Sequence, residues 1–162
     1  MNRINRTLAG AVVALVVLLC VSFHTQGAAQ KDKNGFLEGR SYKDGSVWVL
    51  TFIRTHSGQD IDYLNALSDV WLKQMETLKK EGVLLSFKAL QTNAARVEDY
   101  NILLMLEYKD IRSWEENADK QAVILQTIAK QNPASWQVLQ DNKVREFFGN
   151  NMGREIVFKK HE

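Results

Sequence analysis

A strand, a long amphipathic helix and a second strand follow one another without interruption in residues 47–91. The first segment, VWVLTFIRT, is apolar on both alternating faces and rich in β-branched and aromatic residues, as in a strand covered on both sides. The period then changes to steps of three and four, and a single helical stripe contains Ile61, Leu64, Leu67, Trp71, Met75 and Leu78. Asp60 is placed to cap this helix, and Gly82 to close it. The helix is therefore predicted to pack on a sheet or on another helix.

The second half of the chain repeats this plan more loosely. Strands are predicted over residues 83–91 and 100–108, with the polar connection TNAARVED between them. Asp110 can start a second helix. The apolar stripe of that helix contains Ile111, Trp114, Ala118, Ala122, Leu125 and Ile128.

The remaining elements complete a familiar order. Asn132-Pro133 interrupts the second helix, and a short third helix is expected to end at Gly149. Residues 154–160 are predicted as a final strand. The order is then β-α-β-β-α-β with one extra short helix, which is the ferredoxin-like α+β arrangement. We expect one antiparallel sheet, with the first and third strands in the middle and the helices on one face.

The first 29 residues have the organisation of a secretory signal peptide. Arg3 and Arg6 precede an apolar run over residues 8–23, and small residues follow it up to Ala29. We expect cleavage after Ala29 and a secreted or periplasmic protein that has no membrane attachment once the leader is removed. The alternative is a leader that stays in place as an anchor. Residues 30–45 are predicted as a flexible, charged arm, and residues 46–162 as the folded domain.

Charge and cysteine content argue against several functions. The chain has 21 Lys and Arg against 19 Asp and Glu, and loss of Arg3 and Arg6 with the leader leaves 19 of each sign. A neutral domain without a basic stripe is not typical of nucleic-acid binding, and no nucleic-acid partner is expected. The only cysteine, Cys20, lies in the leader, so the mature chain would have no disulfide, thiol nucleophile or cysteine metal ligand.

The first strand also predicts self-association. Two apolar sets alternate along it, Trp48, Leu50 and Phe52 on one face and Val47, Val49 and Ile53 on the other. Helices on one side of a sheet cover only one of these faces. A two-fold homodimer that packs sheet against sheet would cover the second face with a single self-complementary patch.

Several segments resemble a known group of proteins. WVLTFIRT leads directly into the first helix, and YKDIRSWEENAD joins a strand to a tryptophan-bearing helix. With the order of elements, they resemble the dimeric α/β-barrel superfamily, which includes antibiotic-biosynthesis-monooxygenase-like domains, stress-responsive barrel proteins and chlorite-dismutase-type haem proteins. More narrowly, LKKEGVLLSFKAL and KVREFFGNNMGREIVF resemble exported bacterial proteins of unassigned activity. The resemblance covers about residues 46–160 and implies the fold and the dimer, but it implies no particular chemistry, because this fold hosts many.

In such a dimer, the sheet face away from the helices is predicted to line a cavity. The candidate ligand-binding residues are Trp48, Phe52, Arg54, Lys88, Asn101, Met105 and Glu107, with Leu50, Ser86 and Leu103 on the same face. An apolar pocket with a few converging polar groups is the usual form of a small-molecule site. The alternative is that the interface fills this space and that Lys88 and Glu107 pair across neighbouring strands. A slip of one residue in strand register would exchange this face for the core face.

Catalytic candidates are few. His56 follows the first strand, where it could act as a general base at the cavity mouth or remain an exposed loop histidine. Asn101 is the second candidate. No metal site is expected, because closed zinc sites need several His or Cys ligands and only His56 and His161 would remain after cleavage. No cofactor is expected, since neither helical stripe offers an axial histidine for haem.

Three functions remain open at this stage. The first is an exported homodimer that binds a small apolar or aromatic molecule in the barrel. The second is a cofactor-independent monooxygenase-like enzyme, in which Trp48, Asn101 and His56 would be the residues to test. The third is a structural interaction module whose cavity is filled by side chains.

Overall fold

The computed structural model describes residues 31–160 except for 94, 95, 97 and 98. The predicted signal peptide and His161 lie outside the described residues. The chain divides into two units, Met1–Ser41 and Tyr42–Glu162. In the first unit, an isolated bridge joins Lys31 to Leu37, and the Asp32 carboxylate accepts the backbone N–H groups of Asn34 and Phe36, each at 2.9 Å.

The second unit contains a four-stranded sheet in the order β2-β3-β1-β4. The strands are β1 (Tyr42–Thr55), β2 (Ser86–Gln91), β3 (Ile102–Tyr108) and β4 (Arg145–Phe158). Every neighbouring pair is antiparallel, and β1 and β3 lie in the middle. The chain therefore has the ferredoxin-like α+β fold, as predicted.

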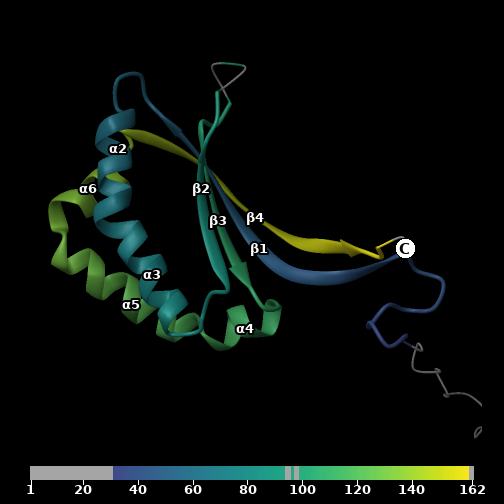
Figure 1. Cartoon of the computed structure of the whole chain (residues 1–162). Coiled ribbons are helices and arrows are strands. Elements are labelled where there is room, and N and C mark those ends of the chain that lie inside the picture. Colours follow the sequence, from purple (N-terminus) through teal and green to yellow (C-terminus); the bar gives the residue numbers. More distant parts are fainter. Residues whose placement is uncertain (1–30, 94–95, 97–98, 161–162) are drawn as a thin grey trace, which may run out of the picture. The chain divides into compact units, whose positions relative to one another are not determined.

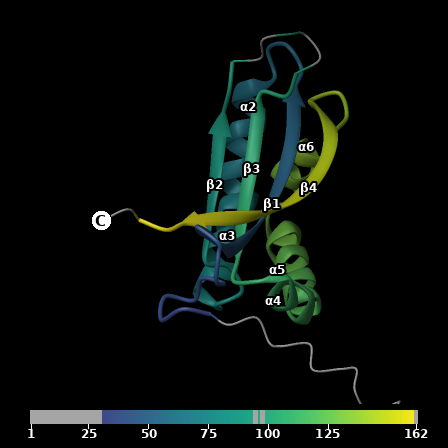
Figure 2. The same ribbon diagram turned by 90° about the vertical axis from the view of Figure 1, so that its right-hand side faces the viewer.

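The helices lie on one side of this sheet (Figure 1). They are α2 (Asp60–Ala66), the π-helical segment η1 (Leu67–Leu72), α3 (Lys73–Lys80), α4 (Ile111–Glu116), α5 (Ala118–Gln131) and α6 (Pro133–Gln140). Figure 2 looks onto the other side, where the strands lie in front of the helices. No helix in the described ranges is both long and apolar enough to cross a membrane.

The first long helix, formed by α2, η1 and α3, follows the predicted stripe only in part. Leu67 and Leu78 are buried as predicted, but Ile61 is 74% exposed, so its assignment to the core is wrong. The π-helical segment is the reason, because its i→i+5 hydrogen bonds give a wider turn that shifts the phase of the stripe. In α2 the buried residues are Tyr63 and Ala66, and in η1 they are Leu67 and Val70.

Three predicted helix boundaries are confirmed. Gly82 follows α3 with a φ of 72°, the left-handed conformation that closes many helices. The Asp110 side chain caps α4 by accepting the backbone N–H of Ser113 at 2.7 Å. Pro133 occupies the first turn of α6, where its missing N–H leaves no partner unsatisfied.

The second helical region buries a different face from the one predicted. Asn117 separates α4 from α5, and α4 buries none of its side chains. Ile111 and Trp114, predicted on the apolar stripe, are exposed. Ile128 is buried as predicted. Ile124, which was not on the predicted stripe, packs against the core. The break at Asn117 changes the helical phase and so invalidates a stripe drawn through both helices.

The first residues of β1 and β4 also differ from the prediction. β4 begins at Arg145, so Phe147 and Gly149 lie within a strand and not at the end of a third helix. β1 begins at Tyr42, inside the segment predicted as an arm. The two strands pair along their whole length. This pairing gives hydrogen-bond partners to the backbone N–H and C=O groups of residues that local sequence signals had assigned to a helix or to irregular chain.

The core lies between the helices and the sheet. Ile53 of β1 and Ile102 and Leu104 of β3 face it, as the alternation of apolar residues predicted. A second cluster beside it is formed by Met75, Leu78, Val83, Leu84 and Tyr108. The register of β1 and β3 is therefore the one that places Trp48, Leu50 and Phe52 on the opposite side of the sheet.

Candidate functional site

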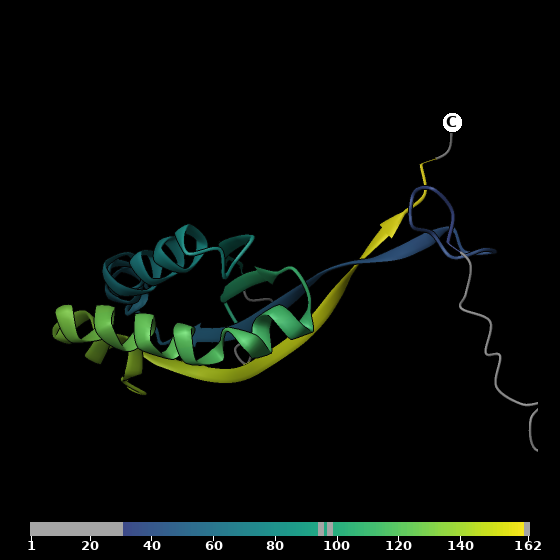
Figure 3. The same cartoon turned by 90° about the horizontal axis from the view of Figure 1, so that it is seen from below.

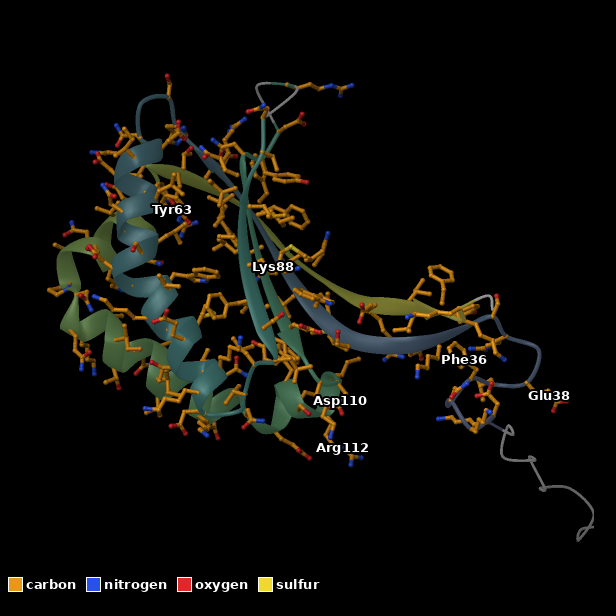
Figure 4. All side chains as sticks on the ribbon, in the orientation of Figure 1. Phe36, Glu38, Tyr63, Lys88, Asp110 and Arg112 are labelled. Atoms are coloured by element: carbon orange, nitrogen blue, oxygen red, sulfur yellow. The ribbon has the colours of Figure 1, made fainter. Side chains whose placement is uncertain are left out.

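The sheet surface away from the helices, here called the open face, brings most of the predicted ligand residues together. Directly opposed residues of neighbouring strands share a face, so the register sorts the side chains into rows. The rows are Gly153, Trp48, Glu107 and Ser86; then Asn151, Leu50, Met105 and Lys88; then Gly149, Phe52, Leu103 and Leu90. Figure 4 shows Lys88 on this side of the sheet, away from the helices.

The centre of the open face is apolar and aromatic. The half-buried residues there are Trp48, Leu50, Phe52, Leu103 and Met105. The ring of Tyr100 meets the ring of Phe52 edge to face, with 4.9 Å between their centroids. This surface can accept flat or aliphatic groups by contact, and it offers few hydrogen bonds of its own.

Lys88 and Glu107 border this centre but do not form the ion pair considered above. The Lys88 ammonium lies 5.6 Å from the centroid of the Trp48 ring, a cation–π contact. Glu107 accepts a hydrogen bond from the hydroxyl of Ser86, which lies directly opposite it. The register places Lys88 opposite Met105, one row away from Glu107, and each of the two charged groups has a different partner, Trp48 for Lys88 and Ser86 for Glu107.

Arg54 closes one end of the open face. Its guanidinium pairs with the carboxylate of Glu146 and lies 5.3 Å from the centroid of the Phe148 ring. Phe148 is the extra residue of a β-bulge, since Phe52 pairs with Gly149 and the next residue of β1 pairs with Phe147. The Arg54 charge is therefore neutralised within the chain.

Asn101 lies apart from this surface, in a polar cluster at the end of β1. Its side-chain oxygen accepts the backbone N–H of Thr55 at 2.9 Å, and its amide nitrogen donates to the Thr55 hydroxyl at 2.7 Å and to the Asp60 carboxylate at 3.2 Å. Asp60 is therefore not the helix cap predicted for it: Gln59 holds that position, and the Asp60 carboxylate accepts from Thr55 and Asn101. The cluster ties β1, the start of β3 and α2 together.

His56 lies just beyond this cluster and is exposed. Its Nε2 atom is 3.0 Å from the backbone carbonyl oxygen of Asn142, so Nε2 carries the proton in this contact. Trp48 and Arg54 are six residues apart on β1, which corresponds to about 20 Å along a strand. His56 and Asn101, at the Arg54 end, therefore do not form one group with Trp48. No group of three or more His, Cys, Asp or Glu side chains suited to a metal ion occurs among the described residues.

Sequence reasoning missed the contribution of β4 to the open face. Gly149 and Gly153 occupy the positions beside Phe52 and Trp48, and a Cβ atom added at either glycine would meet no heavy atom within 4 Å. At these two positions β4 presents bare backbone beside Phe52 and Trp48, and the Asn151 side chain lies between them. The period-two spacing of Gly149, Asn151 and Gly153 was the available signal, but glycines and asparagines also indicate loops.

The helix layer carries hollows of its own. One, of about 350 Å³, lies between α5 and α6 and is lined by Leu125, Gln126, Ala129, Lys130, Pro133 and Trp136. Another, of about 390 Å³, lies between α3 and α5 and includes Glu81 and Lys120, whose charged groups are 2.9 Å apart. Neither contains a predicted site residue.

The strongest pKa shifts belong to the core. Burial raises the pKa of Tyr63 to about 12, and burial likewise raises the pKa of Tyr108 to about 12. Tyr108 donates a hydrogen bond to the side-chain oxygen of Gln121 at 2.8 Å. Both shifts follow from removing a phenol from water, which disfavours phenolate, and neither points to a catalytic group on the open face.

Comparisons with known proteins find solved structures that are similar to this chain. No protein-family model and no curated protein matches the chain. It is similar to the crystal structure of a dimeric ferredoxin-like protein from an uncultured marine organism, with 21% identity, 74% of this chain and 100% of that chain covered, and a TM-score of 0.41. A second such protein, also from an uncultured marine organism, has 13% identity, coverage of 72% and 92%, and a TM-score of 0.41.

Proposed function

We propose that this chain is an exported homodimeric domain that binds a small apolar or aromatic molecule between two facing sheets. The observation that supports this most directly is the open face. Its centre is aromatic and aliphatic, and in the described part of the chain no helix lies on it (Figures 1 and 2). A contiguous apolar patch of this kind on a soluble domain is typical of an interaction surface.

A second copy fits this surface because the patch can complement itself. In a two-fold dimer, each open face covers the other, and the same residues serve both copies. Two sheets packed face to face lie about 10 Å apart, a gap that side chains from both inner faces normally fill.

The two glycines of β4, on either side of Asn151, support a cavity in that gap. Gly149 and Gly153 contribute no side chain to the space between the sheets, whereas Trp48 and Phe52 beside them provide aromatic walls. Lys88, above the Trp48 ring, could bind a polar or anionic group of the ligand. A small aromatic or aliphatic molecule with one polar end fits this combination best.

The other two functions receive less support. An oxygen-activating site would need several polar groups around one substrate position, but Asn101 and His56 are bonded elsewhere and lie at the far end of β1 from Trp48. A fully filled interface would need side chains where β4 has glycines. We therefore place the ligand-binding dimer first.

Native mass spectrometry tests this proposal on protein recovered after expression of the full chain in an export-competent bacterium. The expected result is a dimer that carries additional small-molecule mass, with an N-terminus at Gln30. Trp48→Ala should lose the bound mass and remain a dimer. The matched control is Trp136→Ala, which changes a tryptophan on the helix layer and should keep it.

Three outcomes contradict parts of the proposal. A monomer at micromolar concentration contradicts the dimer. A dimer of bare polypeptide mass, in both wild type and Trp48→Ala, favours a filled interface. An intact leader contradicts export by cleavage after Ala29.

A further inference from the structure

The two longest strands continue beyond the rest of the sheet. Pairing of β1 with β3 ends at Val47 and Tyr108, whereas pairing of β1 with β4 continues to Tyr42 and Phe158. Residues 42–46 and 154–158 therefore form a two-stranded extension, here called the projecting ribbon. Within the described residues, no third strand pairs with it.

The projecting ribbon extends away from the helices. Figure 1 shows β1 and β4 leaving the sheet on the side opposite α2, α3 and α5, and Figure 3, seen from below, shows the same direction. In Figure 2 the end of β4 passes in front of the other strands. The ribbon therefore projects from the side of the sheet that carries the open face.

Specific contacts hold the ribbon in this shape. The Arg154 guanidinium lies 2.8 Å from the Asp44 carboxylate, and the Ser46 hydroxyl donates to Glu155 at 3.2 Å. Gly45 and Ser46 together oppose Glu155, which makes a β-bulge, and bulges increase strand twist. A Cβ atom at Gly45 would lie 2.7 Å from a carboxylate oxygen of Glu155 and 2.9 Å from its Cβ, so this position requires glycine.

The ribbon also exposes large apolar side chains. Ile156 is 54% exposed and Phe158 is 69% exposed. A two-stranded ribbon on its own is only marginally stable in water, and exposed strand edges promote unwanted pairing. A second surface packed against the ribbon would remove Ile156 and Phe158 from water and cover these strand edges.

We infer that the projecting ribbon of each copy packs against the second copy of the dimer, so that two ribbons hold the assembly together from opposite sides. This inference rests on the proposed function, because it requires the sheet-to-sheet dimer. A second copy seated on the open face lies on the side toward which the ribbon projects, so the contact continues the same interface. Two-fold symmetry then makes it reciprocal. The pairing of Arg154 with Asp44 argues against a charged partner, since it neutralises both groups.

The test compares dimer dissociation constants, measured by sedimentation velocity over a dilution series of the protein recovered from full-chain expression. The double variant Ile156→Ser/Phe158→Ser should raise the dimer dissociation constant at least about tenfold. Each substitution is present in both copies and so removes a contact from each of the two ribbons. Ile61→Ser/Val123→Ser is the matched control, because it changes two exposed apolar residues of the helix layer and should leave the constant unchanged. Gly45→Val should also weaken the dimer, because it alters the twist at the bulge.

A second measurement separates packing against the partner from the ribbon's own stability. Hydrogen exchange at residues 43–46 and 154–158 should be slow in the dimer. It should become at least about tenfold faster in the open-face variant Met105→Asp, which is expected to be monomeric.

Each result bears on one of the two claims. If the ribbon variants dissociate like wild type while Met105→Asp is monomeric, the ribbon contact is wrong and the sheet-to-sheet dimer stands. Equal exchange in dimer and monomer also overturns the ribbon contact. If wild type is itself a monomer, both claims are wrong.

Discussion

Asn101 shows how a polar residue in a strand connection can serve the fold. Its side chain makes three hydrogen bonds, two to Thr55 and one to Asp60, and so joins the end of β1 to the start of α2. The backbone N–H of Thr55 has this amide as its acceptor in a part-buried position. Loss of that acceptor leaves a partly desolvated donor without a partner, which is more costly than loss of an exposed hydrogen bond.

Asn101→Ala should therefore lower the free energy of unfolding by about 1–3 kcal/mol. Urea denaturation measures this change, and Asn93→Ala, which changes an exposed asparagine in the connection after β2, is the control and should change it by less than about 0.5 kcal/mol. Unchanged stability of Asn101→Ala would return this residue to the list of functional candidates.

Tyr108 should make stability depend on alkaline pH. A tyrosine in the unfolded chain titrates near pH 10, and burial raises the pKa of Tyr108 to about 12 in the folded chain. Between these values the folded chain binds more protons than the unfolded chain, so the free energy of unfolding falls as pH rises from about 10 to 12. Tyr108→Phe should make this decline shallower, and the remaining slope belongs in part to Tyr63. Urea denaturation at pH 9, 10 and 11 measures the slope, and equal slopes in both proteins would contradict the assignment.

At the scale of single residues, the sequence predicted on which face of the sheet a side chain lies, but not which side chains it contacts. The period of two in β1 and β3 placed Ile53 and Leu104 in the core and Trp48 and Met105 on the open face, because alternation fixes the side of a strand. It could not predict that Lys88 contacts Trp48 and lies one row from Glu107, since that depends on the register between strands. The partners of Asn101 depend on how the chain turns before β3.

At the scale of elements, a π-helical turn decides which residues of the first helix are buried. The simple helical period places both Ile61 and Leu78 in the core, but only Leu78 is buried. Leu78→Ala should destabilise the domain by about 2–5 kcal/mol, as expected for deleting part of a buried leucine. Ile61→Ala should change stability by less than about 0.5 kcal/mol. Thermal or urea unfolding of the pair measures this difference, and equal effects would contradict the shifted stripe.

The last strand shows why element boundaries were the weakest part of the prediction. Gly149 was predicted to end a helix, yet it lies within β4 and pairs with Phe52 of β1. Pairing with a long neighbouring strand overrides local propensity, and no local pattern in residues 145–153 reveals that neighbour. The same pairing of β4 with β1 places Gly149 and Gly153, which have no side chain, on the open face.

At the scale of the whole molecule, the fold and the order of strands followed from the order of elements, whereas the ligand did not. A sheet with helices on one side leaves one apolar face, and self-association is the simplest way to cover it. The size and chemistry of any cavity depend on how two faces meet, which a single chain does not determine. The proposed export rests on residues 1–29, which lie outside the described residues.

The most direct test of the dimer is sedimentation equilibrium of wild type, Met105→Asp and Val123→Asp at about 10 µM. Met105 lies in the middle row of the open face, and Val123 is an exposed residue of α5. A carboxylate in a buried sheet-to-sheet interface would lose its hydration without a partner, whereas one on the helix layer would remain in water. We predict dimers for wild type and Val123→Asp and a folded monomer for Met105→Asp. A wild-type monomer, or a Met105→Asp dimer as stable as wild type, would contradict the open face as the interface.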